Sequence, residues 1–287
     1  MTMKHKMIYP IIIATVFSVT LISCVKDNLH DTPYPDKGTV EISTDWSDAL
    51  SENDIPAVYF ISVDGGEAVE TKEKAFFHTE PMSPGKHNIL AYNKPDAIGI
   101  DGTTARVDIL EPGIINAMPG YLFSAMKQPE VIQDGNVQVL MPMKRHVCPV
   151  KLKLTLTGNN AKNIERIDAV LSGIIASVDL QTGATGDDNM SVIMNKCGHT
   201  ATEVKMQCRV LGVTTGYPQL LTVSITMRDG HKEQTTSDLS VKLKTINTDM
   251  RPVELRADMD APQNGVFGWI ISDWIPMGNI DIDADMQ

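Results

Sequence analysis

Apolar and polar residues alternate one by one through most of the chain beyond residue 38. In the segment TVEISTDW one face of a strand would carry Val40, Ile42, Thr44 and Trp46. Successive side chains of a β-strand point to opposite faces, so this period predicts strands with one buried face and one face in water. Half-buried strands of this kind are typical of antiparallel sheets. The alternation therefore predicts an all-β fold.

The same pattern recurs along the chain, and turn signals with Gly, Pro and Asp separate its occurrences. The segment 160–173 fits either a strand or a helix, and we favour a strand with a short turn of helix nearby. No longer helical pattern occurs, so an α/β fold is not expected. Further strands are expected at 57–63, 87–93, 105–110, 136–143, 150–156, 203–210, 220–227, 240–245 and 252–259.

The first 23 residues differ from everything that follows. A short cationic start, MTMKHKM, is followed by an uncharged apolar run of about 15 residues. A helix that spans a bilayer needs about 20 apolar residues, whereas a signal-peptide core needs only this length. Residues 1–23 are therefore interpreted as a signal peptide.

The end of that apolar run is Leu21-Ile22-Ser23-Cys24, which resembles a bacterial lipobox. In lipoproteins with this motif, Leu21, Ile22 and Ser23 would form the recognition sequence, and Cys24 would be acylated and become the first residue. Acyl chains on Cys24 would hold the protein in the outer membrane, because each buried CH₂ contributes about 0.8 kcal/mol. The alternative is a signal peptide that is cut elsewhere. The following VKDN resembles the export signal of surface-exposed lipoproteins.

These patterns divide the chain into four parts. The signal peptide, 1–23, is followed by a lipidated tether, 24–37, which has two prolines and no periodicity. The strands then predict two tandem antiparallel β-sandwiches, an N-terminal one at 38–142 and a C-terminal one at 143–287. Each is long enough to bury its own core.

The charge of the mature chain argues against two classes of partner. The net charge is −11, and Lys4 and Lys6 are the only charged residues before Cys24, so the remainder carries −13. Nucleic-acid binding depends on Lys and Arg meeting phosphates, and adhesion to anionic lipid headgroups depends on a basic surface. We expect neither.

Three cysteines follow the tether, and their role has three readings. Cys148 and Cys208 share the apolar faces of their strands, which favours packing in the core as small hydrophobic residues. An exported protein can also form a disulfide, here between Cys197 and Cys208. His146 and His199 lie close in sequence, so a mixed Cys/His zinc site is a third reading.

Signatures of catalysis are missing from the sequence. It contains no nucleophile elbow, metalloprotease motif, phosphate-binding loop or dinucleotide-binding fingerprint. We therefore predict a protein that is not an enzyme and that has no cofactor or metal.

Tryptophans can bind ligands when they are exposed. Trp46 lies on the apolar face of its strand, so we expect it in the core. Trp269 and Trp274 are five residues apart, which places them on opposite faces of a regular strand. One face of a sheet cannot bury both, so both are candidates for a contact with a ligand.

The chain ends in a further alternating segment, GNIDIDADMQ. It places Ile280, Ile282, Ala284 and Met286 on one face and three aspartates on the other. Such a strand can close its own sandwich, which we favour, or extend the sheet of another subunit by β-augmentation. The aspartates would also protect an edge from unwanted pairing.

Several phrases occur in an order that resembles Bacteroidetes surface lipoproteins of the fimbrillin-associated superfamily. They are the lipobox at Cys24, VEISTDWSD, PGKHNILAYN, PGYLFSAMKQPEVI, PMKRHVCPVKLKLTLTG and NAKNIERIDAVLSGIIASVDLQTG. The resemblance covers 24 to about 260. It implies tandem transthyretin-like sandwiches and a role at the base, end or surface of type V pili, with fimbrial subunits as partners.

In that superfamily, shaft subunits lose their first strand by cleavage after an arginine. Here no arginine lies between Cys24 and Arg106. We therefore expect the first strand to be retained, as in a fimbrial anchor or accessory subunit. The main hypothesis is a non-catalytic cell-surface lipoprotein of that kind, or an adhesion subunit. The alternative is a surface glycan-binding lipoprotein of a polysaccharide-uptake system.

Overall fold

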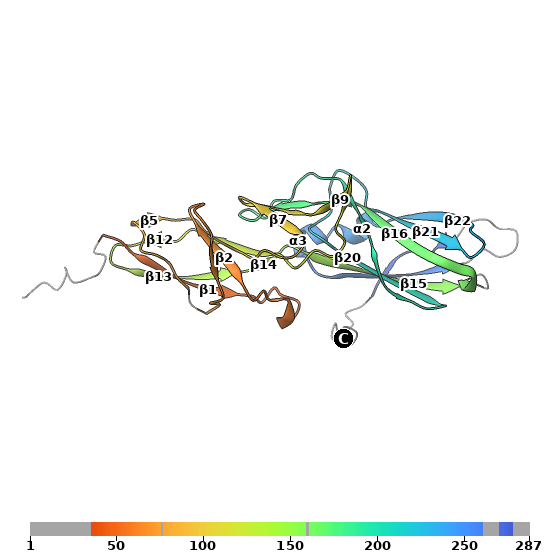
Figure 1. The fold of residues 1–287 in the computed structure, drawn as a ribbon, viewed down its shortest axis with the longest axis horizontal. Helices are drawn as coiled ribbons and strands as arrows, with labels where there is room; N and C mark the ends of the chain where they lie inside the picture. The colour runs from red at the N-terminus through yellow and green to blue at the C-terminus, as the bar shows by residue number, and fades with distance from the viewer. Residues whose placement is uncertain (1–35, 76, 159–160, 261–269, 278–287) are drawn as a thin grey trace, which may run out of the picture.

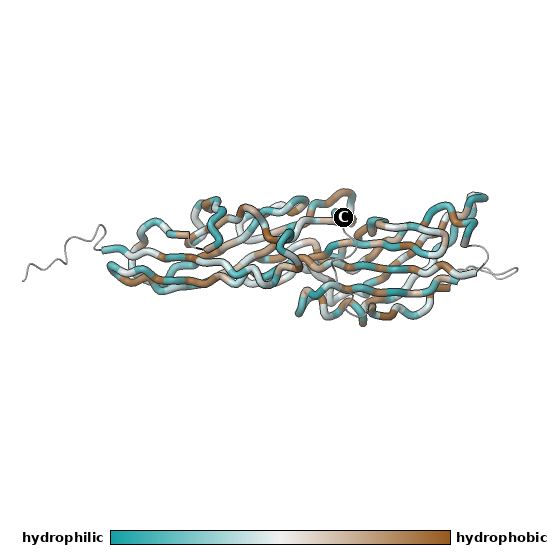
Figure 2. Tube along the Cα trace, turned by 90° about the horizontal axis from the view of Figure 1, so that it is seen from below, coloured by the Kyte–Doolittle hydropathy of each residue, from teal (hydrophilic) through white to brown (hydrophobic). Residues whose placement is uncertain are grey.

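Two β-rich halves lie end to end and form an elongated body (Figure 1). The computed structural model describes residues 36–75, 77–158, 161–260 and 270–277. The all-β sandwich expected from the alternation is confirmed. Figure 2 shows the cause, because hydrophilic and hydrophobic positions alternate along the strands of both halves.

The N-terminal half contains a three-stranded sheet, a five-stranded sheet and a two-stranded ribbon. The three-stranded sheet has the order β13 (Asn136–Pro142), β1 (Thr39–Asp45) and β4 (Phe77–His78). The five-stranded sheet has the order β14 (Lys144–Arg145), β11 (Phe123–Lys127), β6 (Ile89–Tyr92), β2 (Tyr59–Val63) and β3 (Val69–Thr71). The ribbon pairs β12 (Glu130–Val131) with β5 (Gly85–Lys86).

The C-terminal half contains two larger sheets and a three-stranded sheet at its side. The first large sheet has the order β22 (Lys232–Asp238), β21 (Leu220–Met227), β16 (Ile164–Ile174), β18 (Met190–Ile193), β10 (Ile114–Ile115) and β9 (Ile109–Glu111). The second has the order β19 (Asn195–His199), β20 (Glu203–Val210), β15 (Cys148–Thr157) and β23 (Val253–Asp260), and both β24 (Ile270–Ile271) and β25 (Ile275–Pro276) pair with β23. The sheet at the side has the order β17 (Ser177–Asp179), β8 (Thr104–Val107) and β7 (Ile98–Asp101).

Helical structure in the described residues is limited to four short turns. They are η2 (Glu52–Asp54), η3 (Ala161–Asn163), α2 (Ser240–Leu243) and α3 (Ile246–Asp249). The turn η3 followed by β16 agrees with the strand and nearby helical turn expected at 160–173.

The strand expected at 240–245 is wrong, because α2 occupies this place. Leu239, Leu243 and Ile246 are buried, and their spacing places them on one side of a helical segment. The carboxylate of Asp238 accepts hydrogen bonds from the N–H and the hydroxyl of Ser240 at the start of α2. This local bonding competes with a strand.

Most neighbouring strands are antiparallel as expected, but three pairings between described strands are parallel. They join β1 to β13, β10 to β18 and β15 to β23. Alternation reports only that one face of a strand is buried, and it carries no information about the direction of the neighbour. The prediction of purely antiparallel sheets is therefore corrected to mixed sheets.

Each half has its own hydrophobic core. In the N-terminal half, Val40 and Ile42 of β1 pack with Trp46, Tyr59 and Phe123. Trp46 is 8% exposed, and its ring meets those of Tyr59 and Phe123 edge-on at 5.7 and 5.5 Å. Its indole N–H donates to Thr44 Oγ1 at 2.8 Å. The expected core position of Trp46 is confirmed.

The segment 98–115 belongs by its pairing to the C-terminal half. Its strand β8 pairs with β17, and its strand β10 pairs with β18. Ile98, Val107 and Ile115 accordingly lie in the C-terminal core. The boundary at 142 stays a prediction. Strand pairing shows in addition that 98–115, which precedes this boundary, crosses into the C-terminal half, and composition does not reveal this.

We predict that Ile42→Ala destabilises the protein by about 2–5 kcal/mol, because it leaves a cavity in the N-terminal core. Ile42 is fully buried. The measurement is urea unfolding of the mature chain with Cys24→Ala. Leu140→Ala in the same sheet is the control: Leu140 is 57% exposed, so a change of less than about 0.5 kcal/mol is expected. Equal losses in the two variants would contradict the assigned faces.

Candidate functional site

The two halves are joined by buried polar contacts around the segment that links β14 to β15. Arg145 is 4% exposed. Its backbone N–H donates to Asp48 Oδ2 at 2.7 Å, and its Nε donates to the carbonyl of Asp48 at 3.1 Å. Its Nη1 donates to the carbonyl of Val147 at 2.8 Å. The loop after β1 is thereby fastened to the start of the C-terminal half.

A buried Ser–His pair lies beside Arg145. The hydroxyl of Ser124 donates to the carbonyl of Leu180 at 2.9 Å and lies 2.7 Å from His146 Nε2. Since that hydroxyl gives its proton to the carbonyl, the imidazole N–H is the donor to Ser124. Burial lowers the pKa of His146 to about 4, so the ring is neutral. This arrangement joins the halves and leaves His146 no basic nitrogen facing Ser124, so it does not activate a nucleophile.

A third contact ties β20 to the segment before β11. The guanidinium of Arg209 lies 4.1 Å from the centre of the Tyr121 ring and donates to the carbonyl of Pro119 at 3.2 Å. Its backbone N–H donates to the carbonyl of Ala117 at 2.8 Å. Contacts from several strands therefore hold the two halves together at the junction.

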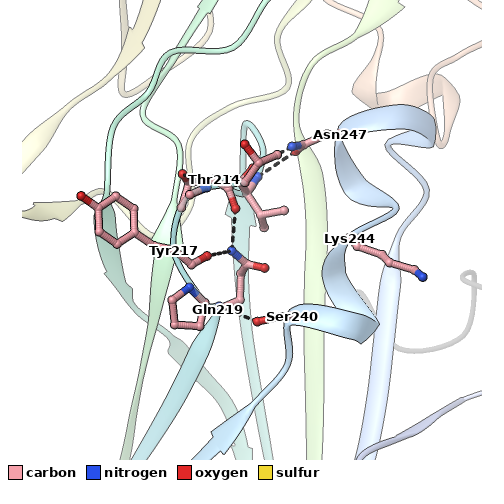
Figure 3. Close-up of a pocket in the computed structure, with 10 residues that line it drawn as sticks. Thr214, Tyr217, Gln219, Ser240, Lys244 and Asn247 are labelled. Atoms are coloured by element: carbon pink, nitrogen blue, oxygen red, sulfur yellow. Dashed lines mark hydrogen bonds between the residues drawn. The ribbon is translucent and has the colours of Figure 1, made fainter.

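A pocket of about 440 Å³ lies beside this junction, between the loop 213–219 and the turns α2 and α3 (Figure 3). Gly173 permits its compact form. Gly173 has φ of +75°, and a Cβ there would come within 2.6 Å of the carbonyl oxygen of Pro218. Asn247 holds the start of the loop, since its side chain accepts from the Val213 N–H at 2.8 Å and donates to the Val213 carbonyl at 2.6 Å.

Gln219 is the central side chain of the pocket and is 4% exposed. Its Nε2 donates to the carbonyls of Thr214 and Tyr217 at 2.8 and 2.7 Å, and it reaches that of Gly173 at 3.5 Å. Its backbone N–H donates to Ser240 Oγ at 2.9 Å. These bonds fix the side-chain amide with its nitrogen turned to the loop.

The amide oxygen of Gln219 points away from the loop, toward the side of the pocket that carries Lys244 (Figure 3). No donor in the part of the chain that the structure describes reaches this oxygen. Lys244 is exposed and forms no ion pair or cation–π contact with any described residue. The ring of Tyr217, which is 54% exposed, points to the other side (Figure 3).

A smaller hollow of about 260 Å³ lies between the halves and is also lined by one lysine. It is lined by Tyr92 and Lys94 on one side and by Thr103 and Gln181 on the other. The ammonium of Lys94 lies 4.1 Å from the centre of the Phe60 ring. Lys94 is thus already engaged by the protein, in contrast to Lys244.

The Gln219 pocket was not predicted from the sequence. Its signals were the turn residues in TTGYPQ and the helical spacing of Leu239, Leu243 and Ile246. Neither signal shows that a loop and a helical turn separated by the hairpin β21–β22 meet.

Several residues chosen from the sequence lie outside the described part of the chain. They are Cys24 with the motif residues Leu21, Ile22 and Ser23, then Trp269, and the C-terminal residues Ile280, Ile282, Ala284 and Met286. Just before these last four, 270–277 lies along β23.

Of the two tryptophans considered for a ligand contact, Trp274 is the one that the structure describes, and it is not exposed. Trp274 is 4% exposed and packs in the C-terminal core, although the segment around it, between β24 and β25, is irregular. Because this segment interrupts strand geometry, the parity argument fails there. Its indole N–H is buried without an acceptor among the described residues. Trp274 offers no ring for a ligand.

The three described cysteines are free, and they divide by burial. Cys148 and Cys208 are buried, as the core reading expects, whereas Cys197 is exposed at a bulge in β19. The thiol of Cys148 donates to the carbonyl of Arg251 at 3.0 Å. Within the described ranges no group of three metal-ligating side chains occurs. Neither a Cys197–Cys208 disulfide nor a zinc site is formed there.

We predict that one of these thiols reacts with a thiol reagent in the folded protein. Burial raises the pKa of the Cys148 thiol to about 12 and raises that of Cys208 as well, which disfavours the reactive thiolate. Titration of the mature chain with Cys24→Ala should give one fast thiol, and three in denaturant. Cys197→Ser should remove the fast one. A fast thiol in the Cys197→Ser variant would contradict the core placement.

We also predict that His146 makes stability fall on acidification. Between about pH 6.5 and 4 the unfolded chain binds a proton on His146 that the folded chain does not. This contribution is complete above pH 6.5 and should fall by about 1–2 kcal/mol by pH 5.

The measurement is the unfolding free energy at pH 7 and 5 for the parent, His146→Gln and His199→Gln. The variant comparison matters because the hydrogen bond from His87 to Asp64 raises the pKa of His87, which contributes stability in the opposite direction. Only His146→Gln should flatten the slope. An unchanged slope in that variant would refute the neutral buried imidazole.

Comparisons with known proteins identify a shared fold. No protein-family model matches the chain, and no curated protein matches it. Among solved structures, the fimbrial anchor protein Mfa2 from Porphyromonas gingivalis has a TM-score of 0.59 and 13% identity, over 84% of this chain and 97% of that chain. A candidate adhesin from Bacteroides ovatus has a TM-score of 0.59 and 10% identity, over 88% and 98%.

A candidate polysaccharide-binding protein from Bacteroides thetaiotaomicron has a TM-score of 0.54 and 9% identity, over 84% of this chain and 95% of that chain. The likeness extends over both halves of the body. The resemblance drawn from the sequence phrases is thus confirmed at the level of the fold. Within the described residues, no helix is both long and apolar enough to cross a membrane.

Proposed function

We propose that this chain is a non-catalytic surface lipoprotein that acts as an anchor or accessory subunit of a fimbria. The proposal joins the lipobox at Cys24 to a two-half body with the fold of a fimbrial anchor protein. Function is inferred from the site and the sequence because fold alone does not fix function.

The observation that carries the proposal is the state of the first strand. All seven residues of β1 pair with β13, and Val40 and Ile42 are fully buried. The sheet position that a donated strand would need is therefore filled by the chain itself. A subunit of this kind is suited to the end of a polymer or to its surface.

The direction of β1 also suits a load-bearing tether. β1 leaves the end of the body from which the tether would extend and runs parallel to β13 toward the junction (Figure 1). A pull on the N-terminus that is resisted by the C-terminal half would shear the seven residue pairs together. It would not open them one at a time.

We predict that deletion of the gene releases fimbriae from the cell or shortens them. Complementation with the unaltered gene should restore attachment, whereas complementation with Cys24→Ala should leave the protein soluble and fimbriae unattached, because the acyl anchor is lost. Electron microscopy of cells and of the medium is the measurement. A Cys197→Ser gene, which keeps the lipidation site, is the control and should complement. Attached fimbriae of normal length in the deletion strain would refute the anchor role.

A second candidate function, glycan binding at the surface, is favoured by the Gln219 pocket. Trp274 cannot serve it, and Trp269 lies outside the described residues. The pocket offers the amide oxygen of Gln219 as an acceptor, and it is also lined by Lys244, whose side chain extends outward without an ion pair to a described residue (Figure 3). The two candidate functions are compatible in one adhesive surface protein.

A further inference from the structure

We propose that the Gln219 pocket binds a neutral, hydroxyl-rich ligand, namely one sugar ring of a surface or host glycan. The inference rests on the second candidate function and assigns it a site and a class of ligand. The pocket lies at the junction end of the C-terminal half, since the end of α3 and the next residue, Met250, line a hollow together with Asp48 and Arg145 of the junction.

The first argument is the orientation of the Gln219 amide. Three carbonyl oxygens surround Nε2, so a flipped amide would place oxygen against oxygen and is excluded. The other amide atom is therefore an acceptor that faces the pocket (Figure 3). Trp274 Nε1 is the only side-chain nitrogen or oxygen in the described residues that is buried without a partner, so the Gln219 oxygen is accessible from the pocket, and a ligand O–H can donate to it in place of water.

The second argument is the pairing of this acceptor with Lys244. The ammonium of Lys244 is a donor that no described carboxylate engages, in contrast to the half-buried pairs of Lys151 and Lys153 with glutamates. A simple anion would satisfy Lys244 but would be repelled by the amide oxygen of Gln219. Lys244 lines the same pocket with its ammonium turned outward (Figure 3). A sugar ring carries several hydroxyls that both donate and accept, so one can donate to Gln219 while another accepts from Lys244, whose flexible stem lets the ammonium turn toward a bound ring.

The third argument excludes chemistry on the bound sugar. None of the ten described residues that line the pocket is Asp or Glu. Hydrolysis of a glycosidic bond generally uses two carboxylates, and hard metal ions also require oxygen ligands with charge. The lining instead contributes amide, hydroxyl and ammonium groups. The pocket can therefore retain a sugar but cannot cleave it.

The fourth argument is that the site is formed before the ligand arrives. Asn247 fixes the start of the loop, Gln219 spans its interior, and Gly173 allows the close packing beneath Pro218. A loop held by its own hydrogen bonds loses little conformational freedom on binding, so more of the contact energy appears as affinity. The volume of about 440 Å³ lies within the usual range for small-ligand pockets.

The test begins with an array of neutral and acidic oligosaccharides and the mature chain with Cys24→Ala. Oligosaccharides that bind are then titrated by calorimetry against three lysine variants. Lys244→Met should weaken binding about tenfold, because a hydrogen bond to a charged group is lost. Lys242→Met, on α2 two residues before Lys244 but outside the pocket lining, should bind as the parent does. Lys94→Met, in the other hollow, should also bind as the parent does.

Gln219→Met removes the acceptor oxygen, so it tests the other half of the proposed contact and should also weaken binding. Because Nε2 also supports the loop, the thermal unfolding of this variant is measured in parallel. If Gln219→Met lowers the unfolding temperature, the loop is disturbed, and the binding of Lys244→Met then decides the test. The inference is overturned if no oligosaccharide binds, if Lys244→Met binds as the parent does, or if Lys94→Met alone loses binding. Binding limited to acidic sugars, with affinity that falls steeply with salt, also overturns it.

The same variants separate this inference from the anchor function. Cells that carry Lys244→Met should keep attached fimbriae, because the substitution touches neither Cys24 nor β1. If Lys244→Met binds sugar as the parent does and attachment of fimbriae still depends on the gene, the sugar-binding site is refuted and the anchor function is not. If Lys244→Met loses sugar binding but fimbriae stay attached in the deletion strain, the anchor function is refuted and the sugar-binding site is not.

Discussion

The pairing of β1 with β13 is the contact on which the N-terminal half depends. It places Val40 and Ile42 between the sheets, against Tyr59 and Phe123. Removing β1 would expose these apolar surfaces and leave the backbone groups of β13 without partners on that side. Both effects oppose folding, because buried apolar area and satisfied backbone groups are the main sources of stability in a sheet. The N-terminal strand is thus a structural element and not an appendage.

The junction extends this dependence to the C-terminal half. The side chains of Arg145 and Ser124 donate to backbone carbonyls on either side of the link, and His146 donates to Ser124. A neutral imidazole suits this place better than a charged one, because burying an unpaired charge costs several kcal/mol. The segment 98–115 reinforces the link, since it leaves the N-terminal half and completes sheets of the C-terminal half. A load applied at the start of β1 can therefore reach the C-terminal half through paired backbone.

Regular alternation made much of this fold predictable, and the errors arose where a second interaction decided the structure. The strands at 203–210 and 220–227 have the bounds expected for them, because burial of one face was sufficient to specify them. At 240–245 the same alternation was outweighed by Asp238, whose carboxylate bonds the backbone of a helical turn. Strand direction, the burial of Trp274 and the Gln219 pocket depend on contacts between distant segments, and the local sequence does not encode these contacts in a readable form.

The distribution of these features along the body links the two candidate functions. The first strand closes the half from which the tether would extend, whereas the Gln219 pocket lies past the junction, on the C-terminal half (Figure 1). A ligand held there would pull on the C-terminal half, and the pull would reach the tether through the junction contacts and the parallel pairing of β1 with β13. Anchoring and ligand binding then use separate residues in one load path, so a change at Lys244 can alter adhesion without weakening the anchor.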